Sequence, residues 1–137
     1  MTPLLEISQL SRKGQYHDIS LSLRQGEITS IIGLLGSGRT ELCLSLFGMS
    51  QPDSGEIRIN GKVVKFHSNR DAIRHGIAYV SEDRLTQGLI MDQSIYDNTL
   101  VSIFDKLHTG TGLMDHRKAA AVVKDLIRDL NIKVPDS

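Results

Sequence analysis

One glycine-rich segment limits what this chain can fold into more than any other part of its sequence. Residues 33–40 read Gly-Leu-Leu-Gly-Ser-Gly-Arg-Thr, after an apolar run and before a helix expected at 39–47. Gly33 and Gly38 have the GxxxxG spacing of a phosphate-binding loop, which needs a strand before it and a helix after it. Glycines let the backbone aim N–H groups at an anion, and the start of the helix adds its dipole. The segment therefore predicts a phosphate site, with the Thr40 hydroxyl available to Mg²⁺.

Arg39 departs from this pattern, because a standard loop has lysine there. The forked guanidinium keeps the positive charge but changes where it sits. Two other readings stay open, namely a glycine-rich turn that binds nothing and a P-loop enzyme of the GTPase or kinase type. The second would use Glu82 and Asp83 as carboxylates at a strand end. Against it, Ser81 separates them from the apolar run, their order is reversed, and no Asn-Lys-x-Asp guanine motif is present.

Charge balance and cysteine content narrow the class of protein. Lys and Arg total 16, and Asp and Glu total 16, so the net charge is zero and no nucleic-acid partner is expected. The single Cys43 excludes a disulfide within the chain and lies among apolar residues, where we expect a small buried hydrophobe. No apolar run approaches the ~20 residues of a bilayer span, and no signal-peptide pattern is present. The composition thus predicts a soluble, cytoplasmic protein.

Apolar runs and turn signals predict that strands come first and helices follow. The run at 27–32 is expected to be a strand buried on both faces, as in a parallel sheet. Asn60-Gly61 predicts a hairpin. The other strands are expected at 4–7, 19–23, 56–60, 62–66 and 77–80.

Capping patterns predict the later helices. Ser68 with Asp71 opens a short helix to residue 75, and Ser94 with Asp97 opens a second one. Asp115 is expected to cap a helix to about residue 130, after a break at 109–112. Apolar faces are expected on the last two helices. Their members are Leu100, Val101, Phe104 and Leu107 on the first, and Val122, Val123, Leu126, Ile127 and Leu130 on the second.

Several motifs together resemble the ATP-binding domain of ABC transporters. They are Gly26-Glu27-Ile28, the loop with its helix start to Leu42, the hairpin at 53–61 and the segment 77–84. More narrowly, Arg-Thr-Glu-Leu at 39–42 with Ser-Glu-Asp-Arg at 81–84 is similar to one subgroup. That subgroup is the second, C-terminal nucleotide-binding domain of tandem ATP-binding proteins for monosaccharide importers of the ribose, galactose, xylose and autoinducer-2 type. The resemblance covers essentially all 137 residues.

The resemblance implies an α/β fold, an incomplete P-loop ABC ATPase core with an N-terminal antiparallel β layer and the start of a helical subdomain. Residues 1–93 would form the core with the Walker A loop and the Q-loop position, and 94–137 would begin the helical subdomain. Mg²⁺ would be held by Thr40 and Glu82, which stands where most members have the Q-loop glutamine. The implied nucleotide-binding residues are Gly33, Gly36, Ser37, Gly38, Arg39, Thr40 and Glu41.

The resemblance also implies cofactors, partners and a location. The cofactors are ATP and Mg²⁺. The partners are transmembrane permease subunits, the other nucleotide-binding domain of the tandem protein and, indirectly, a periplasmic sugar-binding protein. The location is peripheral, on the cytoplasmic face of a bacterial cell membrane. The function is coupling of ATP binding and hydrolysis to monosaccharide import, with a non-catalytic regulatory module as the alternative.

The family's signature motif, Walker B aspartate, catalytic glutamate and switch histidine do not occur in the 137 residues. We therefore expect an N-terminal piece of one domain without catalytic residues of its own, inactive by itself, from a parent protein that hydrolyses ATP.

Individual residues carry further expectations. Tyr16 is expected to pack in the core rather than to stack on adenine. Asp83 and Arg84 are expected to form an exposed ion pair, which contributes little. Met91 and Ile95 belong either to a surface that couples to the permease or to a half-buried hinge.

Overall fold

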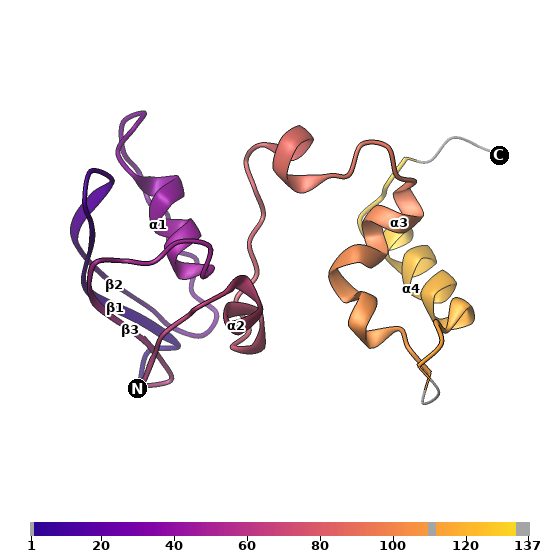
Figure 1. The fold of residues 1–137 in the computed structure, drawn as a ribbon, viewed down its shortest axis with the longest axis horizontal. Helices are drawn as coiled ribbons and strands as arrows, with labels where there is room; N and C mark the ends of the chain where they lie inside the picture. The colour runs from indigo at the N-terminus through magenta and orange to yellow at the C-terminus, as the bar shows by residue number, and fades with distance from the viewer. Residues whose placement is uncertain (1, 110–111, 134–137) are drawn as a thin grey trace. The chain divides into compact units, whose positions relative to one another are not determined.

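The computed structural model describes residues 2–109 and 112–133, and it divides into two compact units (Figure 1). The first unit, Met1–Tyr79, contains the strands and the glycine-rich loop, and the second, Val80–Ser137, is helical. Among the described residues, no helix has the length and apolar character to cross a membrane.

The sheet of the first unit has four antiparallel strands in the order β2-β1-β3-β4. In its centre, Ile7 pairs with Leu21 on one side and with Ile57 on the other. The predicted N-terminal antiparallel layer is therefore confirmed. The strands are β1 (Leu5–Arg12), β2 (Tyr16–Leu23), β3 (Ser54–Ile59) and β4 (Lys62–Val64).

The turn between β3 and β4 forms as its sequence predicts. Asn60 has φ 50° and Gly61 has φ 76°. A two-residue type I′ hairpin needs positive φ at both positions, and Asn-Gly adopts it at low cost.

Two helices pack on the sheet, α1 (Arg39–Leu46) and α2 (Asn69–Arg74). The Ser68 side chain accepts from the Asp71 N–H, so the predicted cap of α2 is confirmed. Figure 1 shows both helices on the same side of the strands. The shared core consists of Ile7, Leu10, Tyr16, Leu42, Ile57, Phe66 and Ala72.

Two predicted strands are wrong. Residues 27–32 and 77–80 form no strand, and the side chains of Ile28 and Ile32 are 96% and 92% exposed. A strand is stable only when a neighbour completes its hydrogen-bond ladder, and no strand in the described part of the chain pairs with either segment. Apolar side chains alone do not supply that ladder.

Over its described residues, the second unit contains a π-helical turn, η1 (Arg84–Gly88), and three further helical elements. They are α3 (Ile95–Leu100), η2 (Val101–Lys106), which is a 3₁₀ helix, and α4 (His116–Asp129). Ser94 caps α3 through the Asp97 N–H, and Asp115 caps α4 through the Lys118 N–H, so both predicted caps are confirmed.

The apolar faces of this unit are only partly as predicted. Leu100, Leu107, Ala119 and Val123 are buried together, with Ile127 packed against them. Val101 and Phe104 are exposed, because the chain tightens to three residues per turn after α3 and their positions rotate off the shared face. Leu130 ends α4 and is exposed. Part of the predicted break at 109–112 lies outside the described residues.

Candidate phosphate-binding site

The glycine-rich loop makes a tight turn before α1. Gly36 and Gly38 have φ of 78° and 85°, left-handed values that side chains rarely adopt. Between them, the Ser37 N–H donates to the Leu34 carbonyl at 3.1 Å. The loop therefore has the backbone that a concave anion site requires.

Gly38 also lies against the first strand pair. A Cβ on this residue would be 2.1 Å from the Gln15 carbonyl oxygen and 3.2 Å from Cβ of Tyr16. Only glycine fits this contact, so the end of the loop is seated on the start of β2. At Gly33 the constraint comes from within the loop, because a Cβ there would be 2.5 Å from Ser37 Oγ.

The first turn of α1 directs unpaired donors out of the helix. Gly38 is its N-cap, and the Leu42 N–H makes the first intrahelical bond, to the Gly38 carbonyl at 2.9 Å. The amides of Arg39, Thr40 and Glu41 therefore have no partner within the helix, and the helix dipole is positive at this end. The side chains of Arg39 and Thr40 are exposed beside these amides. This arrangement suits a bound phosphate.

Tyr16 packs in the core, as predicted. Its side chain is 7% exposed, and its hydroxyl donates to Ser45 Oγ at 2.7 Å. Stacking on a base requires an open ring face, which this burial does not offer. Cys43, by contrast, is half-buried on α1 rather than buried.

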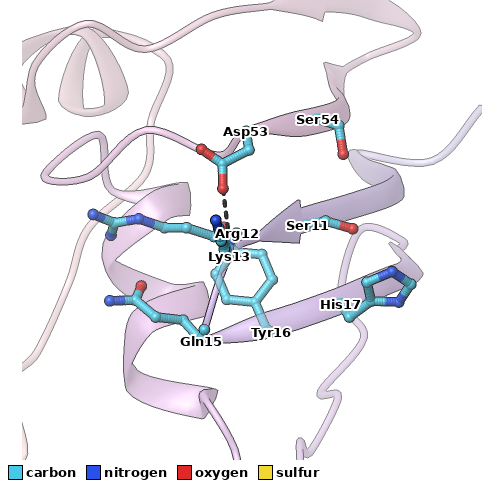
Figure 2. A pocket seen from close by; sticks show the side chains of 9 residues that line it. Ser11, Arg12, Lys13, Gln15, Tyr16, His17, Asp53 and Ser54 are labelled. Carbon is cyan, nitrogen blue, oxygen red and sulfur yellow. Dashed lines mark hydrogen bonds between the residues drawn. The ribbon is translucent and has the colours of Figure 1, made fainter.

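An open pocket of about 700 Å³ lies at the turn between β1 and β2 (Figure 2). Arg12, Lys13 and Gln15 line it from the turn, and Asp53 lines it from the segment before β3. The Lys13 N–H donates to Asp53 Oδ2 at 2.6 Å, the dashed line of Figure 2. Gln15 and Tyr16 line this pocket and also lie against Gly38, so the pocket adjoins the phosphate loop.

Asp83 takes a local structural role that the sequence reasoning missed. Its side chain caps η1 by accepting from the Thr86 N–H at 3.1 Å and from the Thr86 hydroxyl. The Thr86 hydroxyl and N–H bonds hold the pKa of Asp83 below its usual range. Its carboxylate is engaged by Thr86 rather than by Arg84, so the expected ion pair is not what the structure shows. An acidic residue three positions before a threonine was a signal that could have revealed the cap.

A comparison with known protein families identifies the family to which the chain belongs. The family model described as "ABC transporter" matches residues 16–134. The chain belongs to the ABC transporter family. This assignment excludes the GTPase or kinase reading of Glu82 and Asp83.

Curated relatives of this ABC chain are named for sugar import. It is 40% identical over 131 residues to a "Putative ribose/galactose/methyl galactoside import ATP-binding protein" of Geobacillus kaustophilus, which covers 96% of this chain and 26% of the relative. It is 37% identical over 130 residues to the "Ribose import ATP-binding protein RbsA" of Caldanaerobacter subterraneus, covering 95% and 26%. The chain thus spans about a quarter of the length of these relatives.

A solved ABC structure shows the same fold. It is cbiO1 from Clostridium perfringens, described as part of the ABC transporter complex cbiONQ, with a TM-score of 0.70 and 18% identity. The match covers 97% of this chain and 52% of that one. The fold is therefore an incomplete P-loop ABC ATPase core, as the sequence predicts.

ABC ATPases in general bind ATP with Mg²⁺. In this chain, the Thr40 hydroxyl at the phosphate loop fits that requirement. Mg²⁺ keeps several waters and takes few protein ligands when phosphates complete its shell. The exposed Thr40 hydroxyl next to the free helix amides is a group of this kind, and its part in holding Mg²⁺ stays a prediction. In the described ranges, no cluster of three or more His, Cys, Asp or Glu side chains forms a protein-only cage. Glu82 is exposed and belongs to the second unit, so its part in the site stays a prediction.

Proposed function

We propose that this chain binds Mg-ATP through Gly33, Gly36, Ser37, Gly38, Arg39, Thr40 and Glu41. The observation that carries the proposal is the left-handed pair Gly36 and Gly38 leading directly into α1. The free amides of the first turn would bind the phosphates, Arg39 would add a positive charge, and the Thr40 hydroxyl would hold Mg²⁺. We further propose that this binding serves the import of a monosaccharide, which the names of the curated relatives support.

Calorimetric titration with Mg-ATP tests the binding site. The unsubstituted protein is expected to bind, and Arg39→Ala is expected to weaken binding by about 1–3 kcal/mol, as for loss of a charge-assisted contact. Arg117→Ala on the exposed face of α4 is the matched control and leaves binding unchanged. Absence of binding would contradict the proposal, and equal affinity of the two arginine variants would remove Arg39 from the site.

Arg39 supports a second candidate function, a regulatory module that binds ATP without turning it over. Arginine in place of the usual lysine changes the charge that follows the γ-phosphate. We propose that this segment belongs to a longer sugar-import protein. The rate of phosphate release from ATP by that protein distinguishes the two functions. In a regulatory module, Arg39→Lys leaves the rate of release unchanged, whereas in a hydrolytic domain it raises the rate.

We propose that ATP binding acts on transmembrane permease subunits, as ABC ATPases of import systems do in general. Residues 1–93 would form the ATP-binding part and 94–137 the start of the subdomain that meets the permease. In the second unit, Leu89, Ile90, Met91 and Ile95 line an apolar pocket of about 380 Å³, and Met91 is exposed at it. A permease helix inserted there would hold the protein at the inner face of the membrane. The other nucleotide-binding domain and a sugar-binding protein would complete the assembly.

Co-purification with permease subunits tests the docking proposal. Met91→Asp places a charge in the apolar pocket and is expected to reduce recovery of the permease several-fold. Met49→Asp is the matched control, because Met49 is an equally exposed methionine of the first unit. Equal recovery with the two variants would contradict the proposal.

A further inference from the structure

A buried network of hydroxyl groups joins β2 to the helix that follows the phosphate loop. Ser45 of α1 is 1% exposed. Its Oγ accepts from the Tyr16 hydroxyl at 2.7 Å, donates to the Glu41 carbonyl at 3.0 Å and lies 2.9 Å from Ser50 Oγ. A serine hydroxyl has one proton and two acceptor sites. Since Ser45 gives its proton to Glu41, Ser50 must be the donor to Ser45, and every site on Ser45 is used.

The same tyrosine contacts the opposite end of α1. Gly38, the N-cap, is packed so closely on Gln15 and Tyr16 that a Cβ would be 3.2 Å from Cβ of Tyr16. Tyr16 thus lies against the N-cap of the helix through its Cβ and contacts the last turn through its hydroxyl. Contacts at two points along one axis fix both the position and the tilt of a short helix.

The hydroxyl of Tyr16 has a consequence for the first turn of α1. The Glu41 carbonyl can only accept, so the Ser45 proton points to it, and the Tyr16 hydroxyl donates to the same Ser45 oxygen. Glu41 lies in the first helical turn with Arg39 and Thr40. The network therefore runs from β2 to the turn that presents the proposed phosphate ligands. A phenylalanine would fill the same apolar space, so the burial of the ring does not by itself account for the hydroxyl.

We propose that Tyr16 is a positioning residue that holds the first turn of α1, and with it Arg39 and Thr40, in the orientation that binds nucleotide phosphates. The inference rests on the proposed function for its ligand. Tyr16 acts through Ser45 and Gly38 and does not touch the nucleotide.

Tyr16→Phe tests the inference with two readouts. Amide hydrogen exchange at residues 42–46 of α1 is expected to be about 3- to 10-fold faster, the factor that loss of one buried hydrogen bond gives. Exchange in α2 and α4 is expected to stay unchanged. The dissociation constant of Mg-ATP is expected to rise by a similar factor.

Two control variants separate positioning from general loss of stability. Tyr79→Phe removes a hydroxyl in the same unit, next to Phe47 at the end of α1, where the described residues show no hydrogen bond to it. Ile57→Val loosens the shared core without touching the network. Neither is expected to change exchange in α1 selectively. Equal effects of Tyr16→Phe and Ile57→Val would overturn the inference.

A double-mutant cycle completes the test. Ser45→Ala alone and Tyr16→Phe with Ser45→Ala are expected to give the same exchange rates in α1, because the hydroxyl of Tyr16 acts only through Ser45. Additive effects would overturn the inference. If the unsubstituted protein does not bind Mg-ATP, the proposed function fails, whereas the exchange pattern still decides whether Tyr16 holds α1.

Discussion

Gly38 and Gln15 are in backbone contact, although 23 positions separate them in the sequence; a Cβ on Gly38 would lie 2.1 Å from the Gln15 carbonyl oxygen. This contact joins the end of the phosphate loop to the start of β2. Gly38 is buried in this contact, whereas residues 24–37 before it are exposed, so the loop is anchored to the sheet at its C-terminal end.

We expect Gly38→Ala to lower the free energy of unfolding of the first unit by more than about 2 kcal/mol, because the methyl group adds a backbone clash to the strain of a left-handed residue. Gly36→Ala is the matched control. Gly36 has a similar φ but open space around it, so we expect only the left-handed strain of about 1–2 kcal/mol. Urea denaturation of the two variants measures the difference. Equal losses would show that the contact with Gln15 does not constrain the loop.

A second prediction concerns the pH dependence of the α2 cap. The Asp71 carboxylate accepts from the His67 N–H at 3.0 Å, and this bond lowers the pKa of Asp71. Desolvation raises the pKa, whereas Ser68 and Arg74 lower it further. Because the pKa of Asp71 is lower in the folded state, its stabilisation is full above the pKa of the unfolded chain, about 4. The stabilisation is lost as the pH falls through the lower pKa of the folded state.

The difference in stability between the unsubstituted protein and Asp71→Asn should therefore be full at pH 6 and vanish as the pH falls below about 4. Urea denaturation across this range measures it. A difference that persists unchanged at pH 2.5 would show that the charge of Asp71 plays no part.

The two failed strand predictions have a testable consequence. Ile28 and Ile32 are exposed in a segment that has no strand partner in the described residues. Exposed apolar side chains and unpaired backbone groups favour association between chains. We expect the 137-residue chain to self-associate, and Ile28→Lys with Ile32→Lys to reduce the association. Sedimentation velocity reports it. A chain that stays monomeric at high concentration without these substitutions would contradict the expectation.

Local signals in the sequence predict the structure well where the partners lie close in the chain. The caps at Ser68, Ser94 and Asp115 each depend on an N–H three residues away, and all three form. The Asn60-Gly61 turn likewise needs only its own two residues. For the same reason, the loop and the start of α1 follow from their sequence.

Features that depend on distant residues could not be predicted in this way. Whether residues 27–32 become a strand depends on a neighbour, which no local pattern supplies. The hydrogen bond between Tyr16 and Ser45 joins residues 29 positions apart. The contact between Gly38 and Gln15 likewise joins residues that are distant in the sequence. The apolar pattern places Tyr16 in the core, but only the packing of β2 against α1 brings its hydroxyl to a serine.

We also expect that the 137-residue chain does not release phosphate from ATP. Arg39 replaces the lysine that follows the γ-phosphate, and Glu82 does not lie at the end of a paired strand. Removing one positioned group at a reacting phosphate typically costs ~10²–10³ in rate. A phosphate-release assay with Thr40→Ala as the control checks this. Steady, Mg²⁺-dependent release that Thr40→Ala abolishes would contradict it.

Amide NMR spectra of the ¹⁵N-labelled chain, recorded during titration with Mg-ATP, show directly whether the loop and the first turn of α1 bind phosphate. We expect the largest chemical-shift changes at the amides of residues 36–41, since these amides would donate to the phosphates. Amides of α4 serve as the internal reference and should not move. Saturating changes confined to 36–41 and their neighbours would support a phosphate-binding loop. Unchanged amides at 36–41 in the presence of millimolar Mg-ATP would contradict it.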